Sequence, residues 1–248
     1  MSILQKIVAN TKANLVLKKA EFPLEKIQGS LENLKLPRGK FKDHISNKDE
    51  AIIAEIKKAS PSAGVIKEDF DPTKIAMDYE IFGASALSIL TEEDFFMGSV
   101  EYLKEVKKIT SLPILRKDFM IDEYQIYESK LIGADCILLI ASILTDQEIE
   151  DFINIAKKLE LDYLIEVHDE NELKRVEHFE DALIGVNNRN LETFEVDLNN
   201  SVRLKHTFRQ KNIFIAESGI KSREDMDYLK MNNIKVFLIG ESLMRGSF

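Results

Sequence analysis

Cysteine, proline and long apolar runs are scarce in this sequence, and each shortage excludes a class of protein. Cys136 is the only cysteine, so no disulfide framework can form within the chain, and we expect a reducing cytoplasm. Five prolines and ten glycines leave no low-complexity linker. No run of about 18 apolar residues is present, so we predict no membrane span. Lysines also interrupt the apolar core that an N-terminal signal peptide requires.

Positive charge is also in deficit. The formal net charge of -9 at pH 7 argues against a nucleic-acid partner, because such proteins present a basic face to phosphates. A small anionic substrate is compatible with it, since a local cluster of Lys and Arg can outweigh the overall charge. His44, His168, His178 and His206 lack the spacing of metal ligands, so we predict no metal. We interpret His168 as a loop or capping residue and Cys136 as a core thiol.

Short apolar runs recur from residue 51 onward at the spacing of alternating strands and helices. The predicted strands cover 52–56, 86–90, 114–115, 136–140, 163–167, 182–186, 213–216 and 236–239. The predicted helices cover 72–82, 99–109, 123–132, 146–159, 171–179, 198–208 and 223–231. This alternation predicts an α/β fold, an eight-stranded parallel (β/α)8 TIM barrel over 51–245 in a single domain, 1–248. A doubly wound open sheet is the alternative, but no Gly-x-Gly-x-x-Gly follows a predicted strand.

The two ends of the chain differ from the repeating part. Ile3, Ile7 and Leu15 have helical spacing with charged residues between them, which predicts an amphipathic helix packed on the barrel. We therefore expect an N-terminal helical extension over 1–45. At the other end, 240–245 begins only a short helix before the chain stops, so we expect a shortened last helix.

Charged or amide residues stand at the ends of most predicted strands. Glu55 and Lys57 follow the first apolar run two residues apart, so both face the same way. Reacting groups in TIM barrels lie at the carboxyl ends of the strands. One buried ion pair has a structural interpretation, but a whole ring of costly buried charges favours a catalytic site. The ring comprises Glu55, Lys57, Lys117, Glu166, Asn187 and Glu217.

The last two strand-end loops contain glycine. Ser218-Gly219 and Ile239-Gly240 each come between a predicted strand and a helix, and can offer backbone N–H groups to an anion. Phosphate sites of TIM barrels are typically built from these two loops. Glu241 would then contribute its backbone and turn its carboxylate away. Such short pairs are otherwise ordinary turns, and their placement is what favours a phosphate site.

Phenylalanines follow two of the strands that end in polar residues. Phe95 and Phe96 follow the second predicted strand, and Phe119 follows the third. Their rings either line an apolar pocket for an aromatic substrate or belong to the core.

Eight stretches of the sequence carry a family likeness in a fixed order. They are AEIKKASPS at 54–62, LTE at 90–92, Phe96 with Gly98-Ser99, KDF at 117–119, LIEV at 164–167, GVNNRNL at 185–191, AESGI at 216–220 and LIGESLMR at 238–245. With the N-terminal extension, they resemble the indole-3-glycerol-phosphate synthase family over nearly the whole chain. The resemblance implies a carboxy-lyase of tryptophan biosynthesis that needs no metal or organic cofactor. Its substrate would be 1-(2-carboxyphenylamino)-1-deoxyribulose 5-phosphate.

The resemblance also implies roles for the catalytic residues. Lys117 would be the general acid that protonates the ribulose carbonyl oxygen during ring closure. Lys57 and Glu166 would supply the acid and the base of the later dehydration, with their assignment left open. Glu55 would orient both lysines.

The remaining implied residues bind the substrate. Asn187 and Glu217 would hold its hydroxyl groups, Arg189 would brace that network, and Lys57 would also reach the phosphate. The residues implied for the anthranilate moiety are Ser60, Phe96, Phe119, Leu138 and Leu191.

Two other functions compete with this one. A phosphoribosylanthranilate isomerase shares the barrel but needs a cysteine near the end of the first strand, where this chain has Glu55 and Lys57. An inactive barrel that serves as a pathway scaffold would have lost Lys57 and Lys117, and both are present. We expect a small phosphorylated molecule as the partner, no nucleic acid or membrane, and a monomer or weak homodimer.

Overall fold

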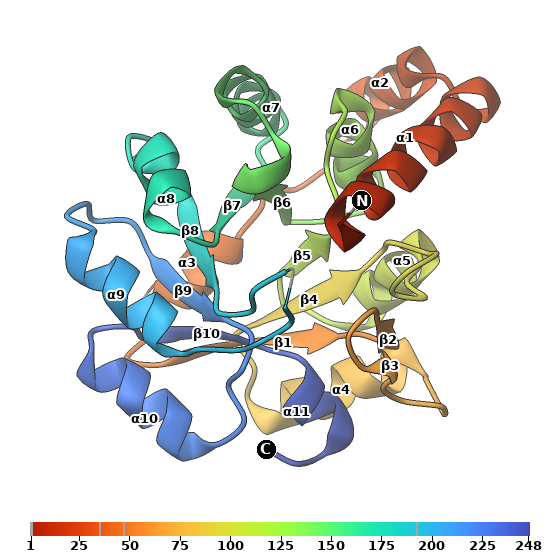
Figure 1. Cartoon of the computed structure of the whole chain (residues 1–248). Helices are drawn as coiled ribbons and strands as arrows, with labels where there is room; N and C mark the ends of the chain where they lie inside the picture. The colour runs from red at the N-terminus through yellow and green to blue at the C-terminus, as the bar shows by residue number, and fades with distance from the viewer. Residues whose placement is uncertain (1, 35, 47, 192) are drawn as a thin grey trace.

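Eight parallel strands close into a barrel in the computed structural model, which describes residues 2–34, 36–46, 48–191 and 193–248 (Figure 1). The strands are β1 (Ala51–Ile56), β4 (Ala86–Leu90), β5 (Ile114–Lys117), β6 (Cys136–Ile140), β7 (Asp162–Val167), β8 (Leu183–Asn187), β9 (Phe214–Glu217) and β10 (Val236–Ile239). Each pairs with the next in chain order, and β10 pairs with β1. The structure therefore confirms the predicted TIM barrel. A small antiparallel pair, β2 (Ala59–Ser60) and β3 (Gly64–Val65), follows β1.

Helices form the outer ring of the barrel. They are α4 (Pro72–Phe82), α5 (Val100–Ile109), α6 (Glu123–Leu131), α7 (Asp146–Lys158), α8 (Glu170–Val176), α9 (Asn199–Thr207), α10 (Arg223–Met231) and the short α11 (Glu241–Arg245), with a 3-10 turn, η1 (Ala141–Ile143), after β6. Asp71 caps α4 through the Thr73 and Lys74 amides, and Gly83 ends it in the left-handed conformation. Helix α8 ends three residues before the predicted end at 179, because the chain turns at Phe179 to enter β8.

The described residues of the N-terminal extension form three helices rather than one. They are α1 (Ile3–Glu21), α2 (Leu24–Asn33) and α3 (Phe41–Ser46). Pro23 separates the first two, because proline has no N–H to continue a helix. Leu15 of α1 and Ile27 of α2 pack with Tyr124 of α6, so α1 and α2 lie beside α6 in Figure 1.

The interior of the barrel changes from apolar to polar along its axis. The helix α3 buries Phe41 and Ile45 among inward-facing residues of the strands, among them Ile53, Leu115 and Ile215. Side chains two residues further along a strand face the same way. This period carries the inner face from Ile53 to Glu55, from Leu115 to Lys117 and from Ile215 to Glu217. The polar ring is thus the last inward layer at the carboxyl ends of the strands.

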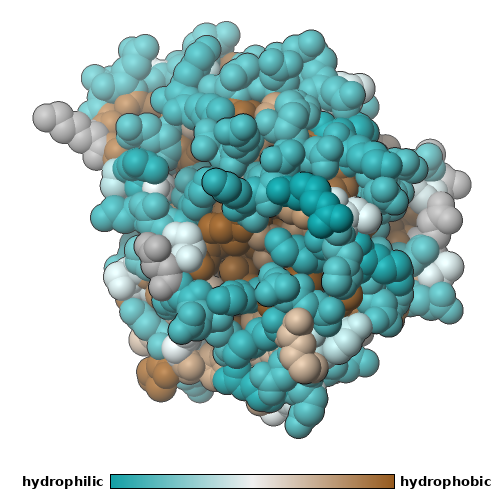
Figure 2. Space-filling view, turned by 90° about the vertical axis from the view of Figure 1, so that its left-hand side faces the viewer, coloured by the Kyte–Doolittle hydropathy of each residue, from teal (hydrophilic) through white to brown (hydrophobic). Residues whose placement is uncertain are grey.

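The outer surface is mainly hydrophilic. On the face shown in Figure 2, teal residues predominate, and hydrophobic residues gather in a small area near the centre. No helix among the described residues is long and apolar enough to cross a membrane.

A buried arginine lies beside Lys117 on the outward side of β5. Arg116 is 1% exposed, and its guanidinium donates to Thr91 at 3.0 Å, to Asp118 at 3.0 Å and to Glu128 at 2.7 Å. This network joins β4, β5 and α6, and so fixes the strand that carries Lys117.

Replacing Arg116 with Met should destabilise the protein by about 3 to 5 kcal/mol, because the buried Asp118 would lose its cation and the partly buried Glu128 would keep only Lys18, 3.9 Å away. The control is Lys104→Met, which breaks the exposed pair with Glu101 and should cost less than about 1 kcal/mol. Chemical denaturation of both variants measures the difference. Equal stability of the two variants would contradict this role of Arg116.

Candidate active site

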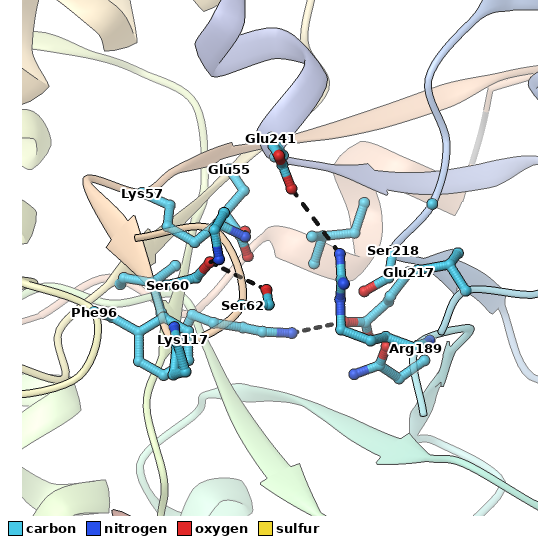
Figure 3. A pocket seen from close by; sticks show the side chains of 18 of the residues that line it. Glu55, Lys57, Ser60, Ser62, Phe96, Lys117, Arg189, Glu217, Ser218 and Glu241 are labelled. Atoms are coloured by element: carbon cyan, nitrogen blue, oxygen red, sulfur yellow. Dashed lines mark hydrogen bonds and ion pairs between the residues drawn. The ribbon is translucent and has the colours of Figure 1, made fainter. Parts of the chain in front are cut away.

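A cavity of about 960 Å³ opens at the carboxyl ends of the strands (Figure 3). Every residue that the sequence analysis assigned to catalysis, substrate binding or phosphate binding lines it. They are Glu55, Lys57, Ser60, Phe96, Lys117, Phe119, Leu138, Glu166, Asn187, Arg189, Leu191, Glu217, Ser218, Gly219, Ile239, Gly240 and Glu241. In Figure 3, Phe96 lies on one side of Lys117, and Arg189 and Ser218 lie on the other. The structure therefore brings all of these residues to one site.

Lys117 is held between two carboxylates. Its Nζ lies 2.6 Å from Glu217 Oε2 and 3.0 Å from Glu166 Oε2. Burial disfavours the charged ammonium, but the carboxylates of Glu166, Glu217 and Glu55 outweigh it and raise the pKa of Lys117 above its ordinary value. Lys117 is therefore a cation at neutral pH.

The two carboxylates differ in their affinity for a proton. Burial raises the pKa of Glu166, but Lys117 and His168, together with a 3.1 Å hydrogen bond from Asn187 Nδ2, bring it below its usual range. Burial prevails for Glu217 and raises its pKa to about 7 despite Lys117. Divergent pKa values in adjacent acids are typical of acid–base sites.

One oxygen of Glu217 is left unpaired among the described residues. Its Oε1 is buried and accepts no hydrogen bond from any residue that the structure describes. Buried polar atoms are normally paired, and an exception calls for a reason. This oxygen lies against Gly185, and its burial accompanies the raised pKa of the Glu217 carboxyl group.

A second ion pair lies at the end of β1. Lys57 Nζ is 2.6 Å from Glu55 Oε1, and the two side chains are 18% and 5% exposed. Glu55 therefore contacts Lys57 directly, whereas its effect on Lys117 is electrostatic. The two lysines share one acidic layer, with separate carboxylate partners.

Of the three phenylalanines that follow strands, two line the cavity and one does not. Phe96 and Phe119 line the cavity with ring centroids 5.9 Å apart, next to Leu138. Phe95 is not among the lining residues, and its backbone N–H donates to Glu92. The pocket interpretation therefore applies to Phe96 and Phe119. The N-terminal helix α1 adds further apolar lining that the sequence analysis did not anticipate, from Ile3, Leu4 and Ile7.

The loop after β9 exposes unused backbone donors to the cavity. Ser218 and Gly219 have φ of 66° and 82°, a left-handed conformation that is rare for serine. Asn188 Nδ2 donates to the Ser218 carbonyl at 3.2 Å. Within the described residues, the N–H groups of Ser218, Gly219 and Glu241 donate to no protein acceptor. Such groups form a site for an anion.

The Glu241 carboxylate is partly exposed and pairs with two arginines. Arg245 Nε lies 3.1 Å from it, and Arg189 Nη2 lies 4.0 Å from it. Their charges offset its own near the anion-binding loop. Arg189 also donates to the Phe194 carbonyl at 3.1 Å, and its backbone N–H donates to Asn187. Arg189 thus braces Asn187 through the main chain.

Two residues that support the site were missed in the sequence analysis. His168 does precede the α8 cap, as predicted, but it also pairs with Glu166. Gly185 of β8 leaves the space that Glu217 fills, because a Cβ there would lie 2.0 Å from Glu217 Oε1. Two features of the sequence could have indicated these roles. Gly185 is at an inward-facing position of its strand, and His168 is only two positions after Glu166. In the described residues, no group of three or more His, Cys, Asp or Glu could hold a metal ion.

Comparison with known proteins points to one family. The profile of "Indole-3-glycerol phosphate synthase" matches residues 4–247. Proteins of that name are 47% identical in Ruminiclostridium cellulolyticum (98% of this chain, 94% of that protein) and 46% identical in Clostridium acetobutylicum (98% and 92%). The solved N-acetylmannosamine-6-phosphate 2-epimerase of Clostridium perfringens is 15% identical, with a TM-score of 0.60 over 79% of this chain and 88% of that one. That likeness shows the fold alone.

Replacing Gly185 with Ala should push the Glu217 carboxylate away from Lys117 and destabilise the protein by about 1 to 3 kcal/mol, the usual cost of overpacking. Gly29→Ala is the control, because a Cβ at Gly29 meets nothing within 4 Å and should be neutral or stabilising in α2. A crystal structure and thermal unfolding measure both effects. An unmoved carboxylate with the stability of the control would contradict the prediction.

Proposed function

The chain belongs to the indole-3-glycerol phosphate synthase family, and on that premise we propose the reaction that it catalyses and the residues that carry it out. The enzyme converts 1-(2-carboxyphenylamino)-1-deoxyribulose 5-phosphate into indole-3-glycerol phosphate, with loss of carbon dioxide and water. It is a carboxy-lyase of tryptophan biosynthesis. The observation that carries the proposal is a charged Lys117, held between Glu166 and Glu217, with an aromatic pocket on one side and an anion-binding loop on the other.

Lys117 acts in ring closure. The ring carbon that bears the carboxylate attacks the ribulose carbonyl carbon, and the carbonyl oxygen takes up a proton as the new carbon–carbon bond forms. Lys117 is the donor, because it is a buried cation that lines the cavity. Carbon dioxide then leaves, and the electron pair of the broken bond between the carboxylate and the ring stays with the ring. With the proton gone from Lys117, Glu166 and Glu217 lose their shared cation and become more basic.

Lys57 and Glu166 act in the dehydration that follows. The departing hydroxyl needs a proton, and a ring proton must be removed to complete the indole. Glu166 has a lowered pKa and is ionised at neutral pH, so it can accept a proton but has none to donate. We assign Glu166 as the base and Lys57, which lines the same cavity, as the acid. Glu55 orients Lys57 through their 2.6 Å ion pair.

The remaining site residues bind the substrate. Two loops hold the phosphate together with Lys57. The loop after β9 offers the N–H groups of Ser218 and Gly219, and the loop at Ile239-Gly240 leads to the N–H group of Glu241. Asn187 and Glu217 hold substrate hydroxyls, and Arg189 supports them. The anthranilate moiety occupies the apolar side, formed by Ser60, Phe96, Phe119, Leu138 and Leu191.

The two alternatives receive no support. An isomerase would need a cysteine near the end of β1, but the single cysteine of this sequence, Cys136, is fully buried in β6. Both lysines that a scaffold would have lost line the cavity. The proposal also includes a cytoplasmic location, a monomer or weak homodimer, and a single domain over 1–248 with its extension at 1–45 and its barrel at 51–245.

Replacing Lys117 with Ala should lower turnover by about a hundredfold or more, in line with loss of a general acid. Growth of indole fluorescence during conversion of the substrate measures the rate, and thermal unfolding checks the fold. Lys104→Ala, on the exposed face of α5, is the control and should have full activity. Full activity of a folded Lys117→Ala variant would remove Lys117 from the mechanism.

A further inference from the structure

A histidine and a glutamate lie directly behind Glu166, outside the cavity. His168 follows β7 and is only 15% exposed at its side chain, and Glu172 of α8 is 16% exposed. Neither residue lines the cavity. The reaction proposed above uses neither, so their burial has no explanation in substrate contact.

The contacts of His168 aim its ring at Glu166. Nε2 lies 3.4 Å from Glu166 Oε1, and Nδ1 lies 3.1 Å from Glu172 Oε2. The same Glu172 oxygen accepts the backbone N–H of His168 at 2.8 Å. Asn200 Nδ2 holds the backbone carbonyl of His168 at 2.9 Å. Glu172 thus fixes the Nδ1 side of the ring, whereas Nε2 is in ion-pair contact with Glu166 and makes no hydrogen bond to any described residue.

The His168 ring carries a positive charge at neutral pH. Burial disfavours the imidazolium, but the carboxylates of Glu166 and Glu172 outweigh it and raise the pKa of His168 to about 10. The result is a row of alternating charges that runs inward from Glu172 to His168, Glu166 and Lys117.

We infer that His168 and Glu172 form an outer ion pair that positions the Glu166 carboxylate beside Lys117. His168 is a positioning residue, because it acts through Glu166 and touches no substrate. Glu172 in turn holds the imidazolium in place. The inference rests on the proposed role of Glu166 as a base, and it gives His168 and Glu172 a part in the reaction.

The charges around Glu166 set the direction of the effect. Lys117 of β5 and His168 favour its ionised form, whereas burial and the nearby Glu217 of β9 oppose it. Glu55 of β1 acts on the same cluster through Lys117. Without the His168 cation, the opposing effects gain, and Glu166 takes up a proton at higher pH. An opposite charge at this range typically lowers the pKa of a carboxyl group by about 1 to 3 units.

The test is His168→Gln, which removes the charge but leaves an amide that can donate to Glu166. In ¹³C spectra of glutamate-labelled enzyme, Glu166 should titrate about one pH unit or more higher than in the wild type. The kcat should fall roughly tenfold or more, and KM should change little. The control, His206→Gln, lies on the exposed side of α9 and should alter none of these quantities. Unchanged titration of Glu166 would overturn the inference.

A second measurement needs no change at His168. In ¹⁵N spectra of the wild type, one histidine ring should stay protonated up to about pH 10, and Glu172→Gln should lower the pH at which it titrates. A His168 ring that is neutral above its ordinary pKa of 6.5 would overturn the inference even if His168→Gln failed to fold. Failure of the proposed function gives a different result, because Glu166→Gln would then keep full turnover.

Discussion

The site depends on one buried cation. Lys117 lies at the end of β5 among Glu55, Glu166 and Glu217, and its charge is what makes so many acids tolerable in a closed barrel. The acids in turn keep the lysine protonated. Removing either sign would leave the other uncompensated. The cluster therefore combines a structural need with a chemical one, since an enclosed, protonated lysine is also a proton donor.

Barrel geometry explains why residues far apart in the sequence meet in this cluster. Inward-facing residues of a strand are two positions apart and belong to successive layers along the barrel axis. A step of two residues therefore leads from the apolar layer to the polar layer. Glu55 and Glu217 come from the two ends of the barrel sequence, yet β1 and β9 both pair with β10. Gly185 provides room for the Glu217 carboxylate. The acids are part of the strands, whereas the loops after β9 and β10 supply the anion-binding groups around them.

Much of the fold and site could be predicted from the sequence. Continuous apolar runs located the strands, and the polar residues that end them located the cavity. The predicted range 72–82 agrees with α4, because Asp71 and Gly83 end that helix through local contacts. The division of the N-terminal extension at Pro23 was missed, although a proline inside a helical pattern is itself a break signal. The pairing of His168 with Glu166 was also missed, because side-chain direction after a strand end depends on the loop.

The charge of Lys117 is the central claim, and NMR titration of ¹³Cε-labelled lysines tests it most directly, with Lys117→Arg to assign the signal. The account predicts that Lys117 titrates above its ordinary pKa of 10.5 in the free enzyme. It also predicts that Glu166→Gln lowers that titration, because one of the two contacting carboxylates loses its charge. A Lys117 that loses its proton near neutral pH, with or without Glu166, would contradict the account.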